Sequence, residues 1–429
     1  MAADSWNKGL AALAGGPPIE ALQQALDRRD SVGVFDWLAQ DLKAGVSAGV
    51  GQERRRAPAR ARLVVEALEL LESDAPDVSE RRRERFFDFA DRAVGRTALM
   101  LSGSGTLAPF HLGVVRELWS RGLLPDIVSG ASGGAHVAAT LGTRRPEELA
   151  AFLRDARLGE EVSKAAGVLA GNGAGRWRRL SPEELEARIV SRIPDLTFAE
   201  AFARSGMAVN ITVTPAMVDA PALMLGPETT PDVLVRDAVR ASCAVPGAFA
   251  PWPLREKRPG GRRAAFAGGQ LWVDGALGCD LPTEALAERF GARHFIASVV
   301  NPMVAWALDD RADQTPLTAA ARYWNGVLFR AHVSLTEPFA RALTSCDPRA
   351  AWLVRTAYAI ASQRYAADVL IVPTERIVGA TRTLSPITPG EARALVAHGA
   401  QRAAEKVSLV DSHARVRGAL DDILGRRAA

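Results

Sequence analysis

A Gly-Ala-Ser-Gly-Gly stretch at Gly130–Gly134 constrains the fold of this chain more than any other feature. It stands between a short apolar run, Ile127–Ser129, and a small-residue run, Ala135–Leu141, which together predict a strand followed by a helix. A G-x-S-x-G motif at such a turn is typical of a nucleophile elbow, with Ser132 as nucleophile and Gly130 and Gly134 beside it. Glycines are expected there because a Cβ atom would clash next to a strained serine. The alternative interpretation is a simple Gly/Ser turn at a helix start.

A glycine-rich loop lies upstream of this motif. The apolar run Ala98–Leu101 predicts a strand, and Gly103-Ser104-Gly105 follows it after one residue. Loops of this kind present backbone N–H groups and allow a substrate oxygen to come close. The loop therefore fits an oxyanion hole formed by Gly103, Ser104 and Gly105, and it fits a phosphate cradle equally well.

The phosphate interpretation leads to a dinucleotide-binding oxidoreductase as a rival function. Gly103-x-Gly105-x-x-Ala108 after a strand matches the loose dinucleotide fingerprint. That fingerprint expects an acidic residue at the end of the second strand, whereas Asp126 lies at its start. The mismatch disfavours this rival, and the absence of a G-x-x-x-x-G-K-[ST] motif excludes a P-loop.

A serine nucleophile needs a base, and an aspartate is the better candidate here. None of the six histidines follows a predicted strand in the usual hydrolase context; His111 and His136 are more typical of core or rim positions. Asp274 ends the short apolar run Gln270–Val273, and α/β proteins place their sites at the carboxyl ends of strands. Burial can raise the pKa of a carboxylate until it serves as a general base. The alternative is a plain Asp-Gly turn.

These features resemble the patatin-like lipid acyl hydrolases. Within that family, the chain is most similar to the subgroup with an N-terminal helical extension, which includes the storage-lipid triacylglycerol lipases of fungi. The resemblance is strong from about Gly95 to Asn301 and weaker on either side. The further matching segments, in the order of the family, are Phe110–Val115, Leu123–Pro125, Val209–Val213, Ala238–Gly247, Asp274–Ala276 and Phe295–Pro302.

The resemblance implies a Ser132–Asp274 dyad that cleaves a lipid ester through an acyl-enzyme, without a metal or organic cofactor. It assigns the Gly103–Gly105 loop to the oxyanion hole. Two pairs of positions depart from the family pattern: Ser104 and Ala108 replace glycines, and Gly133 and His136 replace an alanine and a small residue. A patatin-like module that binds lipid but turns over slowly is therefore the alternative function.

The expected fold class is α/β, with a three-layer patatin-like arrangement around a mostly parallel central sheet. We expect a helical N-terminal region at 1–94, a patatin-like core at 95–302, and a mainly helical region at 303–429. The last region would complete the core and an acyl channel. Strands are predicted at Ala98–Leu101, Ile127–Ser129, Ala208–Val213, Trp272–Val273 and Phe295–Val300.

Composition places few further limits on function. The 429 residues, 48% hydrophobic with a net charge of +4, suit a globular enzyme, and no nucleic-acid motif is present. The clusters Arg54–Arg56 and Arg81–Arg83 indicate solvated helix ends or contact with lipid headgroups. The three cysteines, Cys243, Cys279 and Cys346, show no spacing typical of a disulfide framework or a metal site. The sequence shows neither a signal-like segment nor an apolar stretch of membrane-spanning length. We expect a cytoplasmic protein, with peripheral contact to a membrane or lipid-droplet surface as an open alternative.

Overall fold

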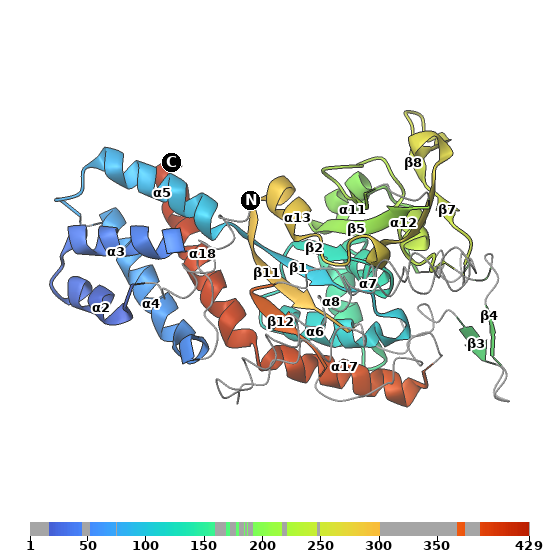
Figure 1. Ribbon diagram of the computed structural model, residues 1–429, viewed down its shortest axis with the longest axis horizontal. Helices are drawn as coiled ribbons and strands as arrows, with labels where there is room; N and C mark the ends of the chain where they lie inside the picture. Colours follow the sequence, from blue (N-terminus) through green and yellow to red (C-terminus); the bar gives the residue numbers. More distant parts are fainter. Residues whose placement is uncertain are drawn as a thin grey trace, which may run out of the picture. The chain divides into compact units, whose positions relative to one another are not determined.

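The computed structural model divides the chain into two compact units, which are described separately (Figure 1). One unit comprises Met1–Thr97, Phe290–His294 and Lys406–Ala429, and the other comprises Ala98–Arg289 and Phe295–Glu405. Much of the expected helical region at 303–429, including Cys346, lies outside the described residues. The described residues are 17–44, 52–73, 75–158, 169–171, 177–179, 184, 187, 192–216, 221–246, 249–300, 367–373 and 387–428.

A mostly parallel sheet forms the centre of the larger unit. Its order is β12-β11-β1-β2-β5-β10-β7, with β6 paired to β5; β1, β2 and β5 run parallel, while β10 is antiparallel to both β5 and β7. The strands are β1 (Arg96–Leu101), β2 (Ile127–Gly130), β5 (Ala208–Pro215), β6 (Leu223–Leu225), β7 (Trp252–Pro253), β10 (Leu271–Asp274), β11 (Ala292–Ser298) and β12 (Val369–Ile371). The last four residues of β1 and all four of β2 are buried, as expected for parallel strands that are covered on both faces. The predicted α/β fold class is confirmed.

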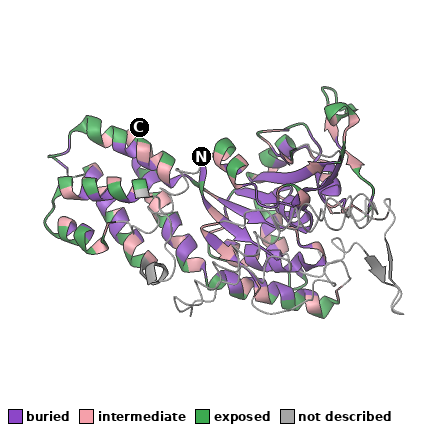
Figure 2. Cartoon of the chain, in the orientation of Figure 1, coloured by how far each residue is buried: buried purple, intermediate pink, exposed green. Residues whose placement is uncertain are grey.

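Helices flank this sheet, and buried residues concentrate on the strands and the helix faces turned toward them (Figure 2). The helices are α6 (Pro109–Ser120), α7 (Gly133–Gly142), α8 (Pro146–Arg154), α11 (Phe198–Ser205), α12 (Val235–Ser242), α13 (Thr283–Phe290) and α17 (Pro389–Ala404). Short 3-10 turns occur at Gly105–Leu107, Phe266–Gly269 and Gly275–Leu277, and two hairpins pair β3 (Leu169–Gly171) with β4 (Trp177–Arg179) and β8 (Arg255–Lys257) with β9 (Arg263–Ala265).

Helices α6 and α17 approach each other closely because glycines line their contact. A Cβ atom on Gly113 would lie 2.0 Å from the carbonyl oxygen of Val396, and one on Gly399 would lie 2.1 Å from that of Phe110. Larger residues at either position would force the two backbones apart. This contact fixes α6, which follows the glycine-rich loop.

The smaller unit is helical and has its own apolar core. Its helices are α2 (Ile19–Asp27), α3 (Ser31–Ala44), α4 (Gln52–Ser73), α5 (Glu80–Val94) and α18 (Val407–Ala428). Leu420 and Ile423 of α18 are fully buried in the same core as Leu22, Leu71 and Phe87. The unit thus joins the first and last helices of the described chain.

The Arg81–Arg83 cluster in α5 divides between structural and surface roles. Arg83 donates hydrogen bonds to the carbonyl oxygens of Leu71 and Glu72, at 3.3 and 3.0 Å. These carbonyl groups lie in the last turn of α4, where they have no partner within the helix. Arg82 is exposed, and its guanidinium lies 4.5 Å from the ring centroid of Phe35. The side chains of the other cluster, Arg54–Arg56, lie outside the described residues.

Candidate active site

The structure brings Ser132 and Asp274 together at one edge of the central sheet. Ser132 follows β2 directly, and Asp274 is the last residue of β10. Because β10 is antiparallel, its carboxyl end would normally reach the opposite edge of a parallel sheet. However, β10 is short and its pairing with β5 involves only the end of that strand, with Asp274 opposite Val213, so its carboxylate stays at the edge where β2 ends. Asp274 thus ends its strand, as the sequence pattern indicated, but this strand runs antiparallel to its neighbours.

The backbone at Ser132 is strained in the manner expected of the motif. Its φ of 51° and ψ of −119° lie in a region that non-glycine residues rarely adopt. A Cβ atom on Gly130 would lie 2.4 Å from the carbonyl oxygen of Gly134, and one on Gly134 would lie 2.1 Å from that of Leu101. Both flanking positions therefore require glycine because backbone atoms pass too close for a side chain.

The last residue of α12 and the turn that follows this helix hold both residues in place. The amide of Ser132 donates to the Ser242 hydroxyl at 2.9 Å, and the Cys243 thiol donates to the Ser132 carbonyl at 3.4 Å. The amide of Asp274 donates to the carbonyl oxygen of Ala244 at 3.1 Å. The matching segment Ala238–Gly247 contained this turn, but the sequence assigned no role to Ser242. The signal was its hydroxyl between Ala241 and Cys243 at the end of the helix.

The Asp274 carboxylate is buried and accepts two hydrogen bonds. One comes from the Ala276 amide at 2.9 Å, and the other comes from the Ser132 side chain. Burial raises the pKa of Asp274 to about 6, although both hydrogen bonds lower it. The pKa of Cys243 rises to about 12 because of burial and the nearby Asp274 charge. Asp274 thus has a pKa suited to taking up and releasing a proton near neutrality.

The glycine-rich loop lies against these two residues. A Cβ atom on Gly103 would lie 2.9 Å from the Ala276 Cβ and 3.6 Å from the Ser132 Cβ. The Gly103 amide donates to the Asp280 carboxylate at 2.6 Å, which anchors the start of the loop. Asp280 is almost fully buried and was not identified from the sequence. Its position six residues after Asp274 carried no recognisable motif.

Two histidines, His111 in α6 and His136 in α7, are buried and weakly basic. His111 contacts the Ser298 hydroxyl at 2.7 Å through Nδ1 and the Ser102 carbonyl at 3.0 Å through Nε2, so both ring nitrogens are engaged. Burial lowers the pKa of both His111 and His136 to about 4. His111 therefore supports the backbone just before Gly103 rather than competing with Asp274 as a base.

Neither metal ligands nor a membrane helix emerge from the described part of the chain. None of its His, Cys, Asp and Glu side chains form a group of three or more that could hold a metal ion. No helix within the described ranges combines the length and apolar character needed to cross a bilayer.

Comparison with known proteins identifies the domain that holds this site. The sequence model of the family described as patatin-like phospholipase matches residues 99–287, which include Gly103, Ser132 and Asp274. The chain contains a patatin-like phospholipase domain. The resemblance inferred from the sequence is therefore confirmed.

Fungal proteins are among the relatives that match this chain. It is 35% identical over 232 residues to a patatin-like phospholipase domain-containing protein of Coccidioides immitis, covering 53% of this chain and 32% of that protein. It is 37% identical over 225 residues to triacylglycerol lipase 4 of Saccharomyces cerevisiae, covering 49% of this chain and 24% of the lipase. The match spans only a quarter to a third of each relative. The crystal structure of VipD from Legionella pneumophila aligns at 16% identity and a TM-score of 0.34, over 74% of this chain and 67% of VipD.

Proposed function

We propose that this chain is a lipid acyl hydrolase that cleaves carboxylic esters with a Ser132–Asp274 dyad. The observation that carries the proposal is the hydrogen bond from the Ser132 side chain to a buried Asp274. The strained backbone at Ser132 supports it independently, and burial raises the pKa of Asp274 toward the range of a general base. The patatin-like domain and a relative named triacylglycerol lipase favour a lipid ester as substrate.

In the proposed reaction, Asp274 first accepts the hydroxyl proton of Ser132 while Oγ attacks the ester carbonyl. The tetrahedral intermediate then collapses, and Asp274 returns the proton to the departing alcohol. Asp274 next takes a proton from a water molecule that attacks the acyl-enzyme. Collapse of the second intermediate releases the carboxylic acid and restores the Ser132 hydroxyl with that proton.

Backbone amides of two segments would hold the negative charge on the substrate oxygen. Within the described residues, no acceptor is found for the amides of Ser104, Gly105 and Gly133. Gly133 begins α7, so its amide points out of a helix N-terminus, which favours an anion. The Gly103 amide already donates to Asp280, and we assign Gly103 the role of fixing the loop that carries the other donors.

Ester hydrolysis by three variants tests this assignment. Ser132→Ala and Asp274→Asn should each lower kcat by about 10³-fold or more, because both groups take part in every turnover. Ser120→Ala is the matched control, since its exposed hydroxyl bonds only within α6. A fluorophosphonate should label the wild type and not Ser132→Ala. Equal rates in the wild type and both dyad variants would refute the proposal, and lipid binding without labelling would favour a slow lipid-binding module.

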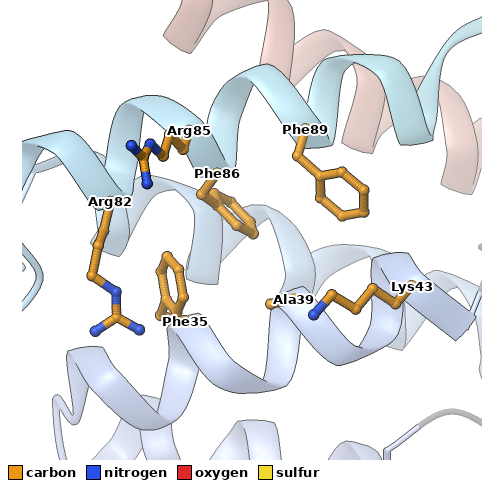
Figure 3. Close-up of a pocket in the computed structure, with 7 residues that line it drawn as sticks. All are labelled: Phe35, Ala39, Lys43, Arg82, Arg85, Phe86 and Phe89. Atoms are coloured by element: carbon orange, nitrogen blue, oxygen red, sulfur yellow. The ribbon is translucent and has the colours of Figure 1, made fainter.

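We also propose that the helical unit contacts an anionic lipid surface. Helices α3 and α5 line a hollow of about 260 Å³ formed by Phe35, Ala39, Lys43, Arg82, Arg85, Phe86 and Phe89 (Figure 3). Aromatic rings lie along this hollow, and the exposed cations Lys43, Arg82 and Arg85 border it. Aromatic and basic residues are favoured together at the headgroup level of a bilayer.

Vesicle sedimentation tests the contact. Each basic residue near an anionic surface contributes about 1 kcal/mol, so Arg85→Glu should weaken binding to phosphatidylserine vesicles by about tenfold or more. Arg28→Glu makes the same charge change on an exposed residue outside the hollow and should bind more tightly than Arg85→Glu. If Arg85→Glu and Arg28→Glu weaken binding equally, the hollow is not the contact site. If the wild type binds uncharged vesicles as well as phosphatidylserine vesicles, the contact is not electrostatic.

A further inference from the structure

Ser104 places a buried hydroxyl beside the residue that follows the proposed nucleophile. Its side chain is 2% exposed, and its Oγ has no hydrogen-bond partner among the described residues. A Cβ atom on Gly133 would lie 2.3 Å from this Oγ, 2.9 Å from the Gly105 carbonyl oxygen and 3.0 Å from the Gly105 nitrogen. The hydroxyl therefore lies where the glycine-rich loop meets the first turn of α7.

The side chains at 104 and 133 compete for one space. Because Oγ occupies the volume that a Cβ on Gly133 would need, a side chain at one position excludes a side chain at the other. The backbone of Ser104 has a φ of −135°, which any residue adopts, so the serine introduces no strain. The two departures from the family pattern, Ser104 and Gly133, are thus a matched pair in this structure.

Location distinguishes this hydroxyl from others that are buried and unpartnered. Ser129 in β2 is also fully buried without a partner for Oγ among the described residues, so burial alone does not indicate a function. Ser104 instead lies against two of the proposed oxyanion donors, Gly105 and Gly133. An O–H group beside backbone amides that stabilise a developing negative charge can add a further hydrogen bond to that charge.

We propose that the Ser104 hydroxyl is a side-chain donor of the oxyanion hole, acting beside the backbone amides of Gly105 and Gly133. The inference rests on the proposed ester hydrolysis. The hydroxyl donates a hydrogen bond to the substrate carbonyl oxygen as that oxygen becomes negative, and no bond to Ser104 forms or breaks. Its contribution should be greater in the transition state than in the bound ester, because the charge appears only there.

Steady-state kinetics of Ser104→Ala test the role, because this change removes only Oγ. We expect kcat to fall by about 10²-fold, as for loss of one oxyanion donor, with KM changed by less than about threefold. The affinity for a trifluoromethyl ketone that mimics the tetrahedral intermediate should fall by about the same factor as kcat/KM. Ser129→Ala is the matched control for loss of a buried, unpartnered hydroxyl, and it should keep the inhibitor affinity.

A cysteine variant separates the hydroxyl from the volume it fills. Ser104→Cys keeps a side chain in the space of Oγ but replaces the hydroxyl by a weak hydrogen-bond donor, and it leaves Gly133 and the adjacent Gly105 backbone unchanged, so we expect it to fold yet lose activity like Ser104→Ala. This variant also carries the test if Ser104→Ala unfolds. Activity of either variant within about threefold of the wild type, with Ser132→Ala inactive, would overturn the inference and leave the hydrolase intact. A wild type no faster than Ser132→Ala would overturn both.

Discussion

Replacing Asp274 by asparagine should stabilise the protein while it abolishes catalysis. The native pKa of Asp274 is about 6, against an ordinary value of 3.8 that applies to the unfolded chain. At about 1.4 kcal/mol per unit, this difference makes the buried charge cost about 3 kcal/mol at neutral pH. Asparagine carries no charge, and its carbonyl oxygen can still accept from the Ala276 amide and the Ser132 hydroxyl.

The sign of the pH dependence follows from the raised pKa. Between about pH 4 and pH 6, the native state holds a proton on Asp274 that the unfolded chain has lost. The stability of the wild type therefore falls as pH rises through this window and then stays level. The asparagine of the variant would not titrate, so the advantage of Asp274→Asn should be about 1.5 kcal/mol at about pH 5 and about 3 kcal/mol at about pH 8.

Urea denaturation at both pH values measures the difference in the free energy of unfolding. Asp232→Asn is the matched control, because it makes the same substitution at an exposed position of the same unit, where no charge is buried. An Asp274→Asn variant that is less stable than the wild type at about pH 8 would refute the reasoning. So would an advantage that does not grow with pH, since the buried charge is its cause.

Three further outcomes follow from the same geometry. The kcat/KM of the wild type should fall about tenfold per pH unit below about pH 6, because only ionised Asp274 can accept the Ser132 proton; a flat pH–rate profile between about pH 4 and pH 7 would contradict this. Gly134→Ala should unfold the site or lower stability by about 3 kcal/mol or more in thermal denaturation, because its Cβ would lie 2.1 Å from the Leu101 carbonyl oxygen; an unchanged Tm would contradict this. Ser242→Ala should cost about 1–3 kcal/mol of stability and lower kcat, because the Ser132 amide loses its buried acceptor; wild-type kcat and Tm together would show that Ser242 does not position Ser132.

Part of the site was predictable from the sequence because a short glycine motif marks it. Gly130 is needed because the nearby backbone of Gly134 passes too close for a side chain, whereas Gly134 is needed because Leu101 at the end of β1 passes it; the same motif includes both glycines. The α/β fold class follows in the same way from alternating strands and helices. Such features depend on a chain's own neighbours and are visible without knowing the tertiary structure.

The long-range contacts of the site could not be predicted in this way. Ser242 bonds to a residue 110 positions away, and Asp280 bonds to one 177 positions away, so neither pairing leaves a local pattern. The direction of β10 was also hidden, because an apolar run that ends in Asp-Gly reads alike in parallel and antiparallel strands. The sequence nevertheless indicated Asp274, because it ends a short apolar run. The antiparallel β10 is short enough that its end still lies near Ser132.

The last residue of α12 and the turn that follows this helix link the stability of this site to its chemistry. Ser132 has an unfavourable backbone conformation and Asp274 carries a buried charge, so both residues destabilise the native state. The hydroxyl of Ser242 and the carbonyl oxygen of Ala244 accept hydrogen bonds from the amides of these same two residues. Each bond holds a strained or charged residue in the position where its side chain meets the other. Loss of these hydrogen bonds should therefore let the Ser132 backbone relax, but this relaxation would move its hydroxyl away from Asp274. Proton transfer between the two residues would then be lost.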